Sequence, residues 1–463
     1  MLRIKNMDMT GGPLLSSIVR YAFPIMLASL VQTLFNAADL AVLGSFASTV
    51  AVAAVGATAP IVGLLVNSVI GLSNGTNVIL SRAIGAGHEQ RAKRVVGSTL
   101  VLSVSVGLLF AVVGVAAAPW FLQITACDPA CLADARTYLS MYFLGVPFIM
   151  LYNFGAAILR VSGDSQRPLY YMIACGLLNL ALNVVLCLLL PQKVVAVAAA
   201  TVASQLLGSV LVVRRLMRTE GPCRLDLRHI SFSLREMLQI VRIGLPSAFN
   251  TALYSISNLQ IQAAVNSFGP ASTAGGAAAA QVESIVSSFN VAMSASTLAF
   301  LGQNLGAGNR ERVKKTFVYN LAISFSCGLV LGVGLYLMGA PILDIFVPND
   351  ALAEQTIAFG LVRMRHILAI QCIASLNGVL VSAVQAFGYP TLPMINSVVT
   401  VLLFRVFWMG VVYPALPMGP DPVKNSVNLY ACYPWSWSLS LAVNITLFAV
   451  IYVRYRRGRV KAV

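Results

Sequence analysis

Charged residues are scarce in this sequence. Asp, Glu, Lys and Arg together make up 10% of its 463 residues, while hydrophobic residues make up 58% and the mean hydropathy is +0.83. A soluble domain carries roughly 25% charged residues. This composition excludes an ordinary soluble enzyme or binding domain, and it predicts a chain that folds within a lipid bilayer.

Catalytic motifs are lacking as well. The chain has only three His residues, and we find no His/Glu metal helix, no Ser/Lys pair and no paired-aspartate motif. Its eight cysteines show no zinc or redox spacing. Cys127 and Cys131 flank Asp128-Pro129, so they either form a small disulfide or stay reduced. We therefore expect a protein that is not an enzyme and has no cofactor.

Long apolar segments are abundant. Each has about 20 residues or more, enough to span about 30 Å of hydrocarbon, and the tenth and eleventh are interrupted by Pro and Gly. The twelve segments are 17–45, 52–78, 95–122, 137–158, 168–190, 194–217, 238–266, 274–300, 316–340, 355–383, 392–416 and 434–455. They predict an all-α integral membrane protein with twelve transmembrane helices.

A repeated segment divides the chain into halves. Ile84-Gly-Ala-Gly-His-Glu-Gln-Arg-Ala-Lys-Arg94 reappears 221 positions later as Leu305-Gly-Ala-Gly-Asn-Arg-Glu-Arg-Val-Lys-Lys315. Such recurrence indicates a duplicated unit. We predict two six-helix lobes, 1–217 and 238–463, joined by a connector at 218–237 and related by a pseudo-twofold along the membrane normal, as in secondary transporters. Each Gly-Ala-Gly turn should end a helix before a basic amphipathic surface segment.

The net charge of +16 is placed on one side of the predicted membrane. Of 31 Lys and Arg residues, 25 fall in the N-terminal segment, alternate loops and the C-terminal tail, whereas Arg136, Lys193 and Lys424 are the three in the opposite loops. The charge is therefore not a nucleic-acid footprint. The bias puts both termini in the cytoplasm.

Polar residues inside spans are costly and indicate a functional site. In the first span, Gln32, Asn36 and Asp39 lie at i, i+4 and i+7, which is one helix face. Asp39 is the only acid in that span. It predicts a cation or proton site. The alternative is a structural carboxylate near the interface that caps or pairs.

Further polar pairs occur in the fifth and sixth spans. Asn179 and Asn183 lie one turn apart, as do Thr201 and Gln205. With Asp39, their oxygens could surround a small hard cation or bind a neutral carboxyl group. Alternatively, these side chains hold helices together.

Two tyrosines and two prolines complete the first-lobe candidates. Tyr138 and Tyr142, near the outer end of the fourth span, either line the same cavity or belong to the aromatic belt. Pro24 and Pro246 occupy equivalent places in the first span of each half, where proline kinks a helix. We consider both as hinges, with a static kink as the alternative.

The second half differs chemically from the first. The repeat places Ile261 opposite Asp39 and Asn258 opposite Asn36. Glu283, in the eighth span, is the only acid well inside the spans of this half. It either binds a cationic substrate or a proton, or pairs structurally with Arg405 or Arg363.

With these residues laid out, the chain resembles the multidrug and toxic compound extrusion (MATE) family of antiporters over essentially its whole length. The motifs that carry the resemblance are Pro24, Asp39, the Ile84–Arg94 loop, Leu159-Arg-Val-Ser-Gly-Asp-Ser-Gln-Arg-Pro168, Asn179, Asn183, Gly302-Gln-Asn-Leu-Gly-Ala-Gly308 and Gln385-Ala-Phe-Gly-Tyr-Pro-Thr-Leu-Pro393. The resemblance implies two six-helix lobes around a V-shaped cleft. It also implies export of cationic or amphipathic drugs in exchange for H⁺ or Na⁺.

Within the family, the chain looks closest to the bacterial DinF-like branch, whose site lies in the N-terminal lobe. This likeness implies that Asp39 is the coupling acid. Asn179, Asn183, Thr201 and Tyr138 fall at positions similar to its ion-coordinating or hydrogen-bonding residues, and the first three would ligate Na⁺ with Asp39. Some members carry a second acid where this chain has Asn183.

Another branch uses acids in the seventh and tenth spans, which 250–266 and 366–385 lack. Glu283 is similar to an acid in the eighth span of some relatives. We therefore predict a monomeric efflux antiporter of the bacterial inner membrane that exports drug-like small molecules. The alternative is a lipid-linked oligosaccharide flippase of the same superfamily, which usually has additional spans and a markedly basic cavity. A passive channel is disfavoured because the chain has no ring of equivalent pore residues.

Overall fold

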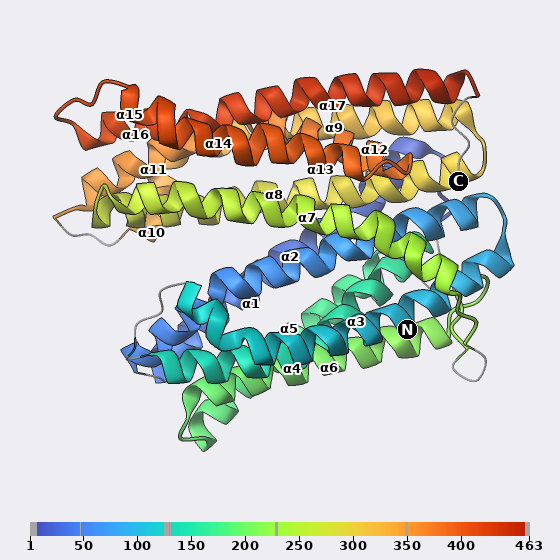
Figure 1. The fold of residues 1–463 in the computed structure, drawn as a ribbon, viewed down its shortest axis with the longest axis horizontal. Coiled ribbons are helices and arrows are strands. Elements are labelled where there is room, and N and C mark those ends of the chain that lie inside the picture. Colours follow the sequence, from blue (N-terminus) through green and yellow to red (C-terminus); the bar gives the residue numbers. More distant parts are fainter. Residues whose placement is uncertain are drawn as a thin grey trace. The chain divides into compact units, whose positions relative to one another are not determined.

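The structure is a computed structural model that describes residues 7–46, 48–124, 129, 131–226, 230–347 and 351–458. Within these ranges every regular element is a helix (Figure 1). In a bilayer a helix satisfies its own backbone hydrogen bonds, so long apolar runs of this kind fold as helices. The all-α prediction is confirmed.

The first half forms six long helices, each of 24 to 37 residues. They are α1 (Leu14–Phe46), α2 (Thr49–Gly85), α3 (Glu89–Ile124), α4 (Leu132–Val161), α5 (Gln166–Leu189) and α6 (Lys193–Met217). All six are long and apolar enough to cross a membrane. Each corresponds to one predicted span.

The second half begins with three long helices. They are α7 (Leu234–Asn266), α8 (Pro270–Gly306) and α9 (Arg310–Leu337), followed by the short α10 (Gly339–Phe346). Of the three, α8 and α9 meet the same test of length and hydropathy. Helix α7 has 33 residues and is long enough to span, but it is more polar.

The tenth and eleventh spans are irregular. Helices α11 (Ala353–Ile367) and α12 (Gln371–Ala386) form one span that bends by 44° at a short break. The break falls at Leu368-Ala369-Ile370, so the expected interruption by Pro or Gly is wrong there. The eleventh span is continuous, and two of its segments are π-helical. Its parts are α13 (Thr391–Ser397), η1 (Val398–Leu403), α14 (Phe404–Phe407), η2 (Trp408–Val412) and α15 (Tyr413–Ala415).

The last span contains α16 (Pro422–Tyr430) and α17 (Cys432–Arg456). By their internal contacts the residues form two compact units. Unit 1 comprises 1–248 and 302–308, and unit 2 comprises 249–301 and 309–463. The boundary falls inside α7 at Ala248, two residues after Pro246.

The two Gly-Ala-Gly turns end α2 and α8, as expected. Gly87 has φ 70° and Gly308 has φ 69°, a left-handed conformation that glycine adopts without strain. The basic residues that follow are not on separate surface segments, which corrects that expectation. They lie in the first turns of the long helices α3 and α9. Arg91 of α3 donates to Glu236 (3.2 Å) and Gln239 (3.0 Å) of α7, within unit 1.

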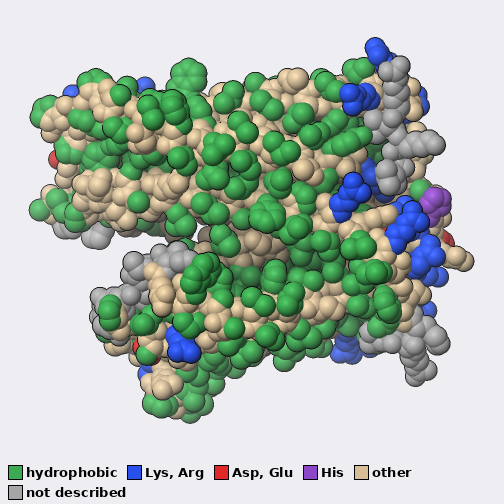
Figure 2. All heavy atoms as spheres, viewed as in Figure 1, with side chains coloured by type: hydrophobic (Ala, Val, Ile, Leu, Met, Phe, Trp, Pro, Cys, Tyr) green, Lys and Arg blue, Asp and Glu red, His purple; other side chains and the backbone are tan. Residues whose placement is uncertain are grey.

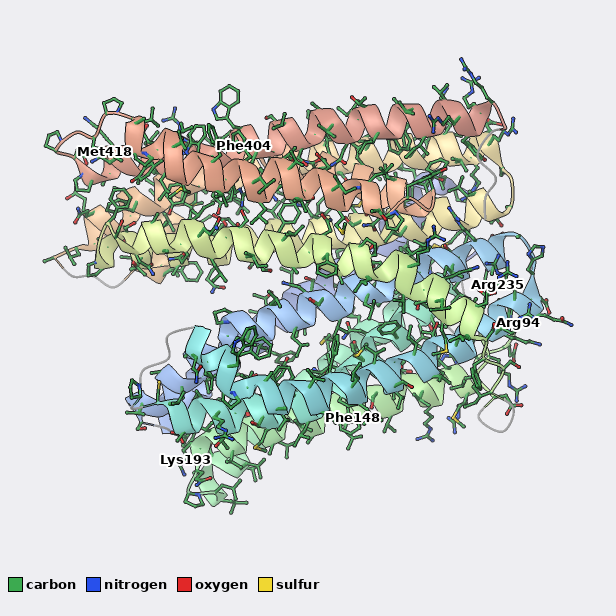
Figure 3. The ribbon with its side chains drawn as sticks, viewed as in Figure 1. Arg94, Phe148, Lys193, Arg235, Phe404 and Met418 are labelled. Carbon is green, nitrogen blue, oxygen red and sulfur yellow. The ribbon has the colours of Figure 1, made fainter. Side chains whose placement is uncertain are left out.

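Basic side chains gather at one end of the helices within each unit (Figure 2). In unit 1, Arg94 and Arg235 lie at one end and Lys193 at the other (Figure 3). This agrees with the one-sided charge distribution read from the sequence. We call the end with Arg94 the basic end of unit 1.

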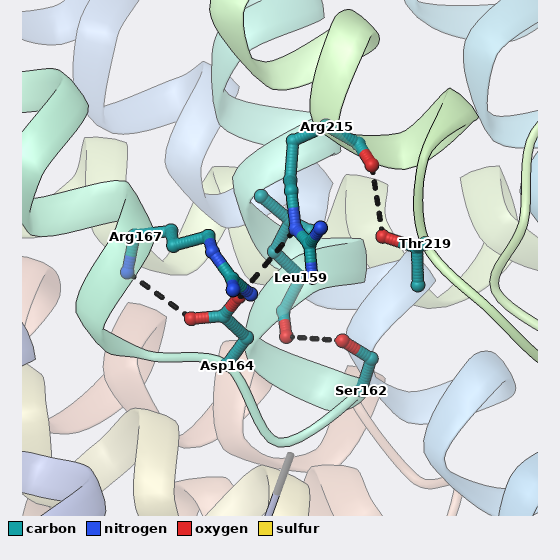
Figure 4. Close-up of polar contacts among 6 residues, drawn as sticks. All are labelled: Leu159, Ser162, Asp164, Arg167, Arg215 and Thr219. Carbon is teal, nitrogen blue, oxygen red and sulfur yellow. Dashed lines mark hydrogen bonds and ion pairs between the residues drawn. The ribbon is translucent and has the colours of Figure 1, made fainter. Parts of the chain in front are cut away.

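A buried ion cluster fixes the basic ends of α4, α5 and α6 (Figure 4). Asp164, in the turn after α4, forms ion pairs with Arg167 of α5 and with Arg215 of α6, the latter at 4.0 Å. Its Oδ1 also accepts from the Arg167 backbone N–H at 3.1 Å. Only 1% of the Asp164 side chain is exposed. The cluster therefore holds α5 and α6 in a fixed relation, and both helices carry candidate site residues.

Candidate functional site

The candidate site in unit 1 is a chain of hydrogen bonds across three helices. Asn183 of α5 donates from Nδ2 to Oδ1 of Asp39 on α1 at 2.6 Å and to Oδ1 of Asn179 at 3.3 Å. Asn179 then donates to Thr201 Oγ1 on α6 at 3.5 Å, and Thr201 donates to the Val197 carbonyl at 3.0 Å. Helix α5 packs against both α1 and α6. The structure thus brings four predicted residues together.

One atom of this chain is left unsatisfied. Asn183 is fully buried, and its Oδ1 has no hydrogen-bond partner among the described residues. The orientation of its amide follows from its neighbours, because a carboxylate and an amide oxygen both require a donor. Buried polar atoms are nearly always paired. An orphaned acceptor beside a carboxylate therefore indicates a position that a cation or a proton donor can fill.

Two tyrosines of α4 lie near Asp39. Tyr138 and Tyr142 are both 8% exposed, and their ring centroids are 6.2 Å apart. Both lie close enough to Asp39 to interact with its charge. The two rings are therefore packed inside unit 1, and their role in a cavity stays a prediction.

A close approach of α1 to α5 was not predicted from the sequence. An added Cβ at Gly176 of α5 would overlap the ring of Phe35 on α1. Phe35 lies one turn before Asp39, and Gly176 lies three residues before Asn179. The absence of a side chain at Gly176 therefore lets the two helices approach where the acid meets its amide. In the sequence, the position of Gly176 one turn before the Asn179–Asn183 pair could have predicted this close approach.

Other candidates do not join the chain of hydrogen bonds. Gln32 and Gln205 are half-buried, and neither side chain forms a hydrogen bond with a described residue. The side chain of Asn36 lies outside the described residues, as does Cys127, so the proposed Cys127–Cys131 disulfide falls outside them too.

The prolines lie inside α1 and α7, as predicted. Pro24 also lines a wide surface hollow, together with Leu15, Ser16, Val19, Arg20, Phe23 and Gln166. Leu15, Val19 and Phe23 are about half exposed, so this hollow is open to the surroundings of unit 1. A hinge at either proline stays a prediction.

In unit 2, Glu283 is paired. Arg363 donates from Nε to Oε1 at 2.8 Å and from Nη2 to Oε2 at 2.9 Å, and each side chain is 14% exposed. A bidentate pair of this kind is strong and directional. Of the alternatives for Glu283, pairing with Arg363 is the one observed.

Asn258 also has partners in unit 2. Its Oδ1 accepts from Arg405 Nη1 at 3.0 Å and from the Tyr433 hydroxyl at 3.3 Å. From the sequence, Arg405 was expected only as a possible partner of Glu283. In the structure its partners are neutral groups on α7 and α17.

A family model matches the chain twice. The model, MatE, covers residues 24–185 and 246–408. The chain belongs to the MatE family. The two matches begin at Pro24 and Pro246, 222 residues apart, which confirms the duplicated unit.

The relatives of this MatE chain include named transporters. It is 26% identical to the probable multidrug resistance protein YoeA of Bacillus subtilis, covering 91% of the chain and 90% of the relative. It is 23% identical to a FAD transporter of Shewanella oneidensis, and the match covers 91% of this chain and 94% of that relative. A crystal structure of MATE in complex with MaL6 superposes with a TM-score of 0.86 at 22% identity, covering 98% and 99%. The chain is therefore a multi-pass membrane protein of a multidrug-resistance transporter family, with the two-lobe MATE fold.

Proposed function

We propose that the protein is a secondary antiporter that exports amphipathic, cationic small molecules in exchange for H⁺ or Na⁺. Asp39 is the coupling residue, and Asn183, Asn179 and Thr201 assist it. The bias of basic residues supports an inner-membrane orientation with both termini in the cytoplasm. The single observation that carries the proposal is the 2.6 Å contact of Asp39 with Asn183, whose Oδ1 lacks a partner.

Both candidate ions suit this group of atoms. Na⁺ is a hard cation that prefers carboxylate, amide and hydroxyl oxygens, and Asp39, Asn183 and Thr201 supply one of each. A protonated Asp39 carries an O–H donor, which suits the unsatisfied Asn183 Oδ1. Either ion would change how α1 is held against α5.

The ion gradients available to a bacterial cell provide enough free energy. One pH unit corresponds to about 1.4 kcal/mol, and 100 mV of membrane potential provides about 2.3 kcal/mol per charge. In a one-for-one exchange with a monovalent cation the membrane potential cancels, so one pH unit drives the solute uphill by about tenfold. The potential adds to this only where more than one ion enters for each cation that leaves. A carboxyl group that alternates between an ion-bound and an ion-free state is sufficient for this exchange.

The test uses everted membrane vesicles that contain wild type or Asp39→Asn. A pH gradient and a Na⁺ gradient are imposed separately while uptake of a cationic dye is measured. Asp39→Asn keeps the shape of the side chain and removes its titrating proton, so we expect gradient-driven uptake to be lost at normal expression. Asp344→Asn, which changes an exposed acid of α10, is the matched control. Wild-type uptake rates in Asp39→Asn would refute the coupling role.

A further inference from the structure

A buried arginine occupies the middle of the eleventh span. Arg405 is 1% exposed and lies in α14, between the π-helical segments η1 and η2. Its neighbour Phe404 lies between the two ends of the unit 2 helices (Figure 3). Interruptions of this kind in an α-helix occur frequently at functional sites. Burying a permanent positive charge in the middle of a span is energetically costly, so its interactions indicate why it is there.

Among the described residues, the groups that bind the Arg405 guanidinium are neutral. Nε donates to Ser436 Oγ at 3.3 Å, and Nη1 donates to Ser257 Oγ at 3.2 Å and to Asn258 Oδ1 at 3.0 Å. The guanidinium carbon lies 4.3 Å from the ring centroid of Tyr433. Hydroxyls, an amide oxygen and a ring face solvate the charge, but they do not neutralise it.

Glu283, the acid that the sequence offered as a partner of Arg405, is paired with another arginine. Glu283 binds Arg363 through both of its oxygens. Within the described part of unit 2, no carboxylate forms an ion pair with Arg405, and its Nη2 has no hydrogen-bond partner. Buried charges in proteins are ordinarily paired. A negative charge that pairs with Arg405 would therefore have to come from outside the described residues of unit 2.

The duplication relates this arginine to the site in unit 1. Arg405 follows Asn183 by 222 residues, and Asn258 follows Asn36 by the same interval, which also separates Pro24 from Pro246. In each unit a polar bridge joins the first and fifth helices of the repeat. Unit 1 has an acid on the first helix and an amide on the fifth, whereas unit 2 has an amide on the first and an arginine on the fifth.

The bridge in unit 2 is open to displacement. Asn258 is an exposed residue of α7, and it accepts one hydrogen bond from Nη1. An anionic group could replace Asn258 at Nη1 and bind the free Nη2 as well. Guanidinium presents two parallel donors that match the two oxygens of a carboxylate or phosphate.

We propose that Arg405 is the centre of an anion-binding site in unit 2 that takes the carboxylate or phosphate group of an amphipathic solute. This inference rests on the proposed export function, and it extends the substrate class from simple cations to solutes that also carry a negative group. A transported solute and an anionic lipid headgroup share this chemistry. The experiment separates these two sources.

The probes are rhodamine B, which carries a carboxylate, and its ethyl ester, in which that carboxylate is blocked. Binding to the purified full-length protein in nanodiscs of neutral lipid is measured by titration calorimetry, with empty nanodiscs as the blank. We expect rhodamine B to bind about tenfold or more tightly than the ester, the value of one charge-assisted hydrogen bond. Equal affinities of wild type for the two probes would overturn the proposal.

Three variants test the role of Arg405. Arg405→Gln should remove the preference for the acid and leave binding of the ester unchanged, while Arg405→Lys should retain part of the preference. Asn258→Asp supplies an internal counterion at the position that now accepts from Nη1. It should abolish the preference and raise the melting temperature, so the proposal can be tested even where Arg405→Gln does not fold. A preference that survives in Asn258→Asp or in folded Arg405→Gln would refute the site.

To identify the source of the anion, binding of rhodamine B is also measured in nanodiscs that contain phosphatidylglycerol, an anionic lipid, and is compared with binding in neutral lipid. Weaker binding of rhodamine B there, in wild type but not in Arg405→Gln, would identify a lipid headgroup as a ligand of the same site. Unchanged binding would assign the site to the solute. Because the assay measures binding alone, the preference for the acid stands or fails independently of whether Asp39→Asn loses gradient-driven efflux.

Discussion

Replacing Gly176 by Ala should disturb the coupling site without touching any of its polar atoms. The added Cβ would overlap the ring of Phe35. Ordinary carbon–carbon contact is about 3.5–4 Å, so the Phe35 ring must move by more than about 1 Å, and α1 moves with it unless the ring rotates aside. Asp39 lies one turn further along the same helix, and its bond to Asn183 is 2.6 Å long. Such bonds extend to only about 3.2 Å, so a shift of α1 by this amount is enough to break the contact.

The expected magnitudes follow from this geometry. Overpacking a tight contact costs about 1–3 kcal/mol, and replacing glycine by alanine inside a helix returns about 0.5–1 kcal/mol. The net destabilisation should therefore be about 0.5–2 kcal/mol. A hydrogen bond to a charged group contributes about 1.5–3 kcal/mol, so losing the Asp39–Asn183 contact should change the half-saturating concentration of the driving ion by about tenfold or more.

The assay compares thermal unfolding and ion dependence of dye efflux for Gly176→Ala and Gly44→Ala. Gly44 lies in α1, and no atom comes within 4 Å of its added Cβ, so it controls for the change in helix propensity alone. Adding Phe35→Leu to Gly176→Ala should restore part of both properties, because it removes the obstructing ring. Wild-type stability and ion dependence in Gly176→Ala would refute the argument that this contact sets the separation of α1 and α5.

Three further outcomes are expected. Asn179→Ala and Thr201→Ala should shift the half-saturating ion concentration about fivefold, as one neutral interaction predicts, with little effect on maximal efflux; unchanged ion dependence in both would mean that they only hold helices together. Pro24→Ala should impair coupled efflux more than Pro246→Ala at matched expression, because Asp39 lies on the helix of Pro24, and equal losses would make both prolines structural. Asp164→Asn should lower the free energy of unfolding by about 1.5–3 kcal/mol, measured by denaturation in detergent, and an unchanged value would exclude a stabilising role for the buried ion cluster.

Much of the fold could be predicted because a segment that crosses lipid must be a helix of about 20 mostly apolar residues. Apolar runs located all the spans, but several helices extend beyond them into polar residues. Helix α2 continues to Gly85 instead of residue 78, since Ser81 and Arg82 are buried within the protein. The break at Leu368–Ile370 has no proline or glycine in it, so the sequence does not place it. The π-helical segment η2 contains Gly410 and is followed by Pro414, but these residues alone do not predict a π-helix.

The candidate site was partly predictable for a related reason. A polar residue inside a span is conspicuous, so Asp39, Asn183, Asn179 and Thr201 could be named as a set. Which helices approach closely is a matter of shape, and the contact of Gly176 with Phe35 was therefore missed. The sequence also left the partner of Glu283 open between two arginines, because spacing along the chain does not fix which side chains meet across helices.

The second copy of the repeat has Ile261 at the position where the first copy has Asp39, and this difference affects Arg405. Ile261 lies three residues after Asn258 on α7, is 2% exposed, and packs in the same core cluster as Tyr433. A carboxylate at this position, as the first copy of the repeat has in Asp39, would lie one turn from the group that binds Arg405 and would neutralise it internally. An arginine paired in this way has little affinity for an external anion, because a new ligand must first displace a charged partner. With an apolar residue at 261, Arg405 has no counterion among the described residues of unit 2. Unit 2 has Ile261 in place of an acid and an arginine without a counterion, which together suit it to the anionic group that we propose. Unit 1 has Asp39, which suits it to a cation.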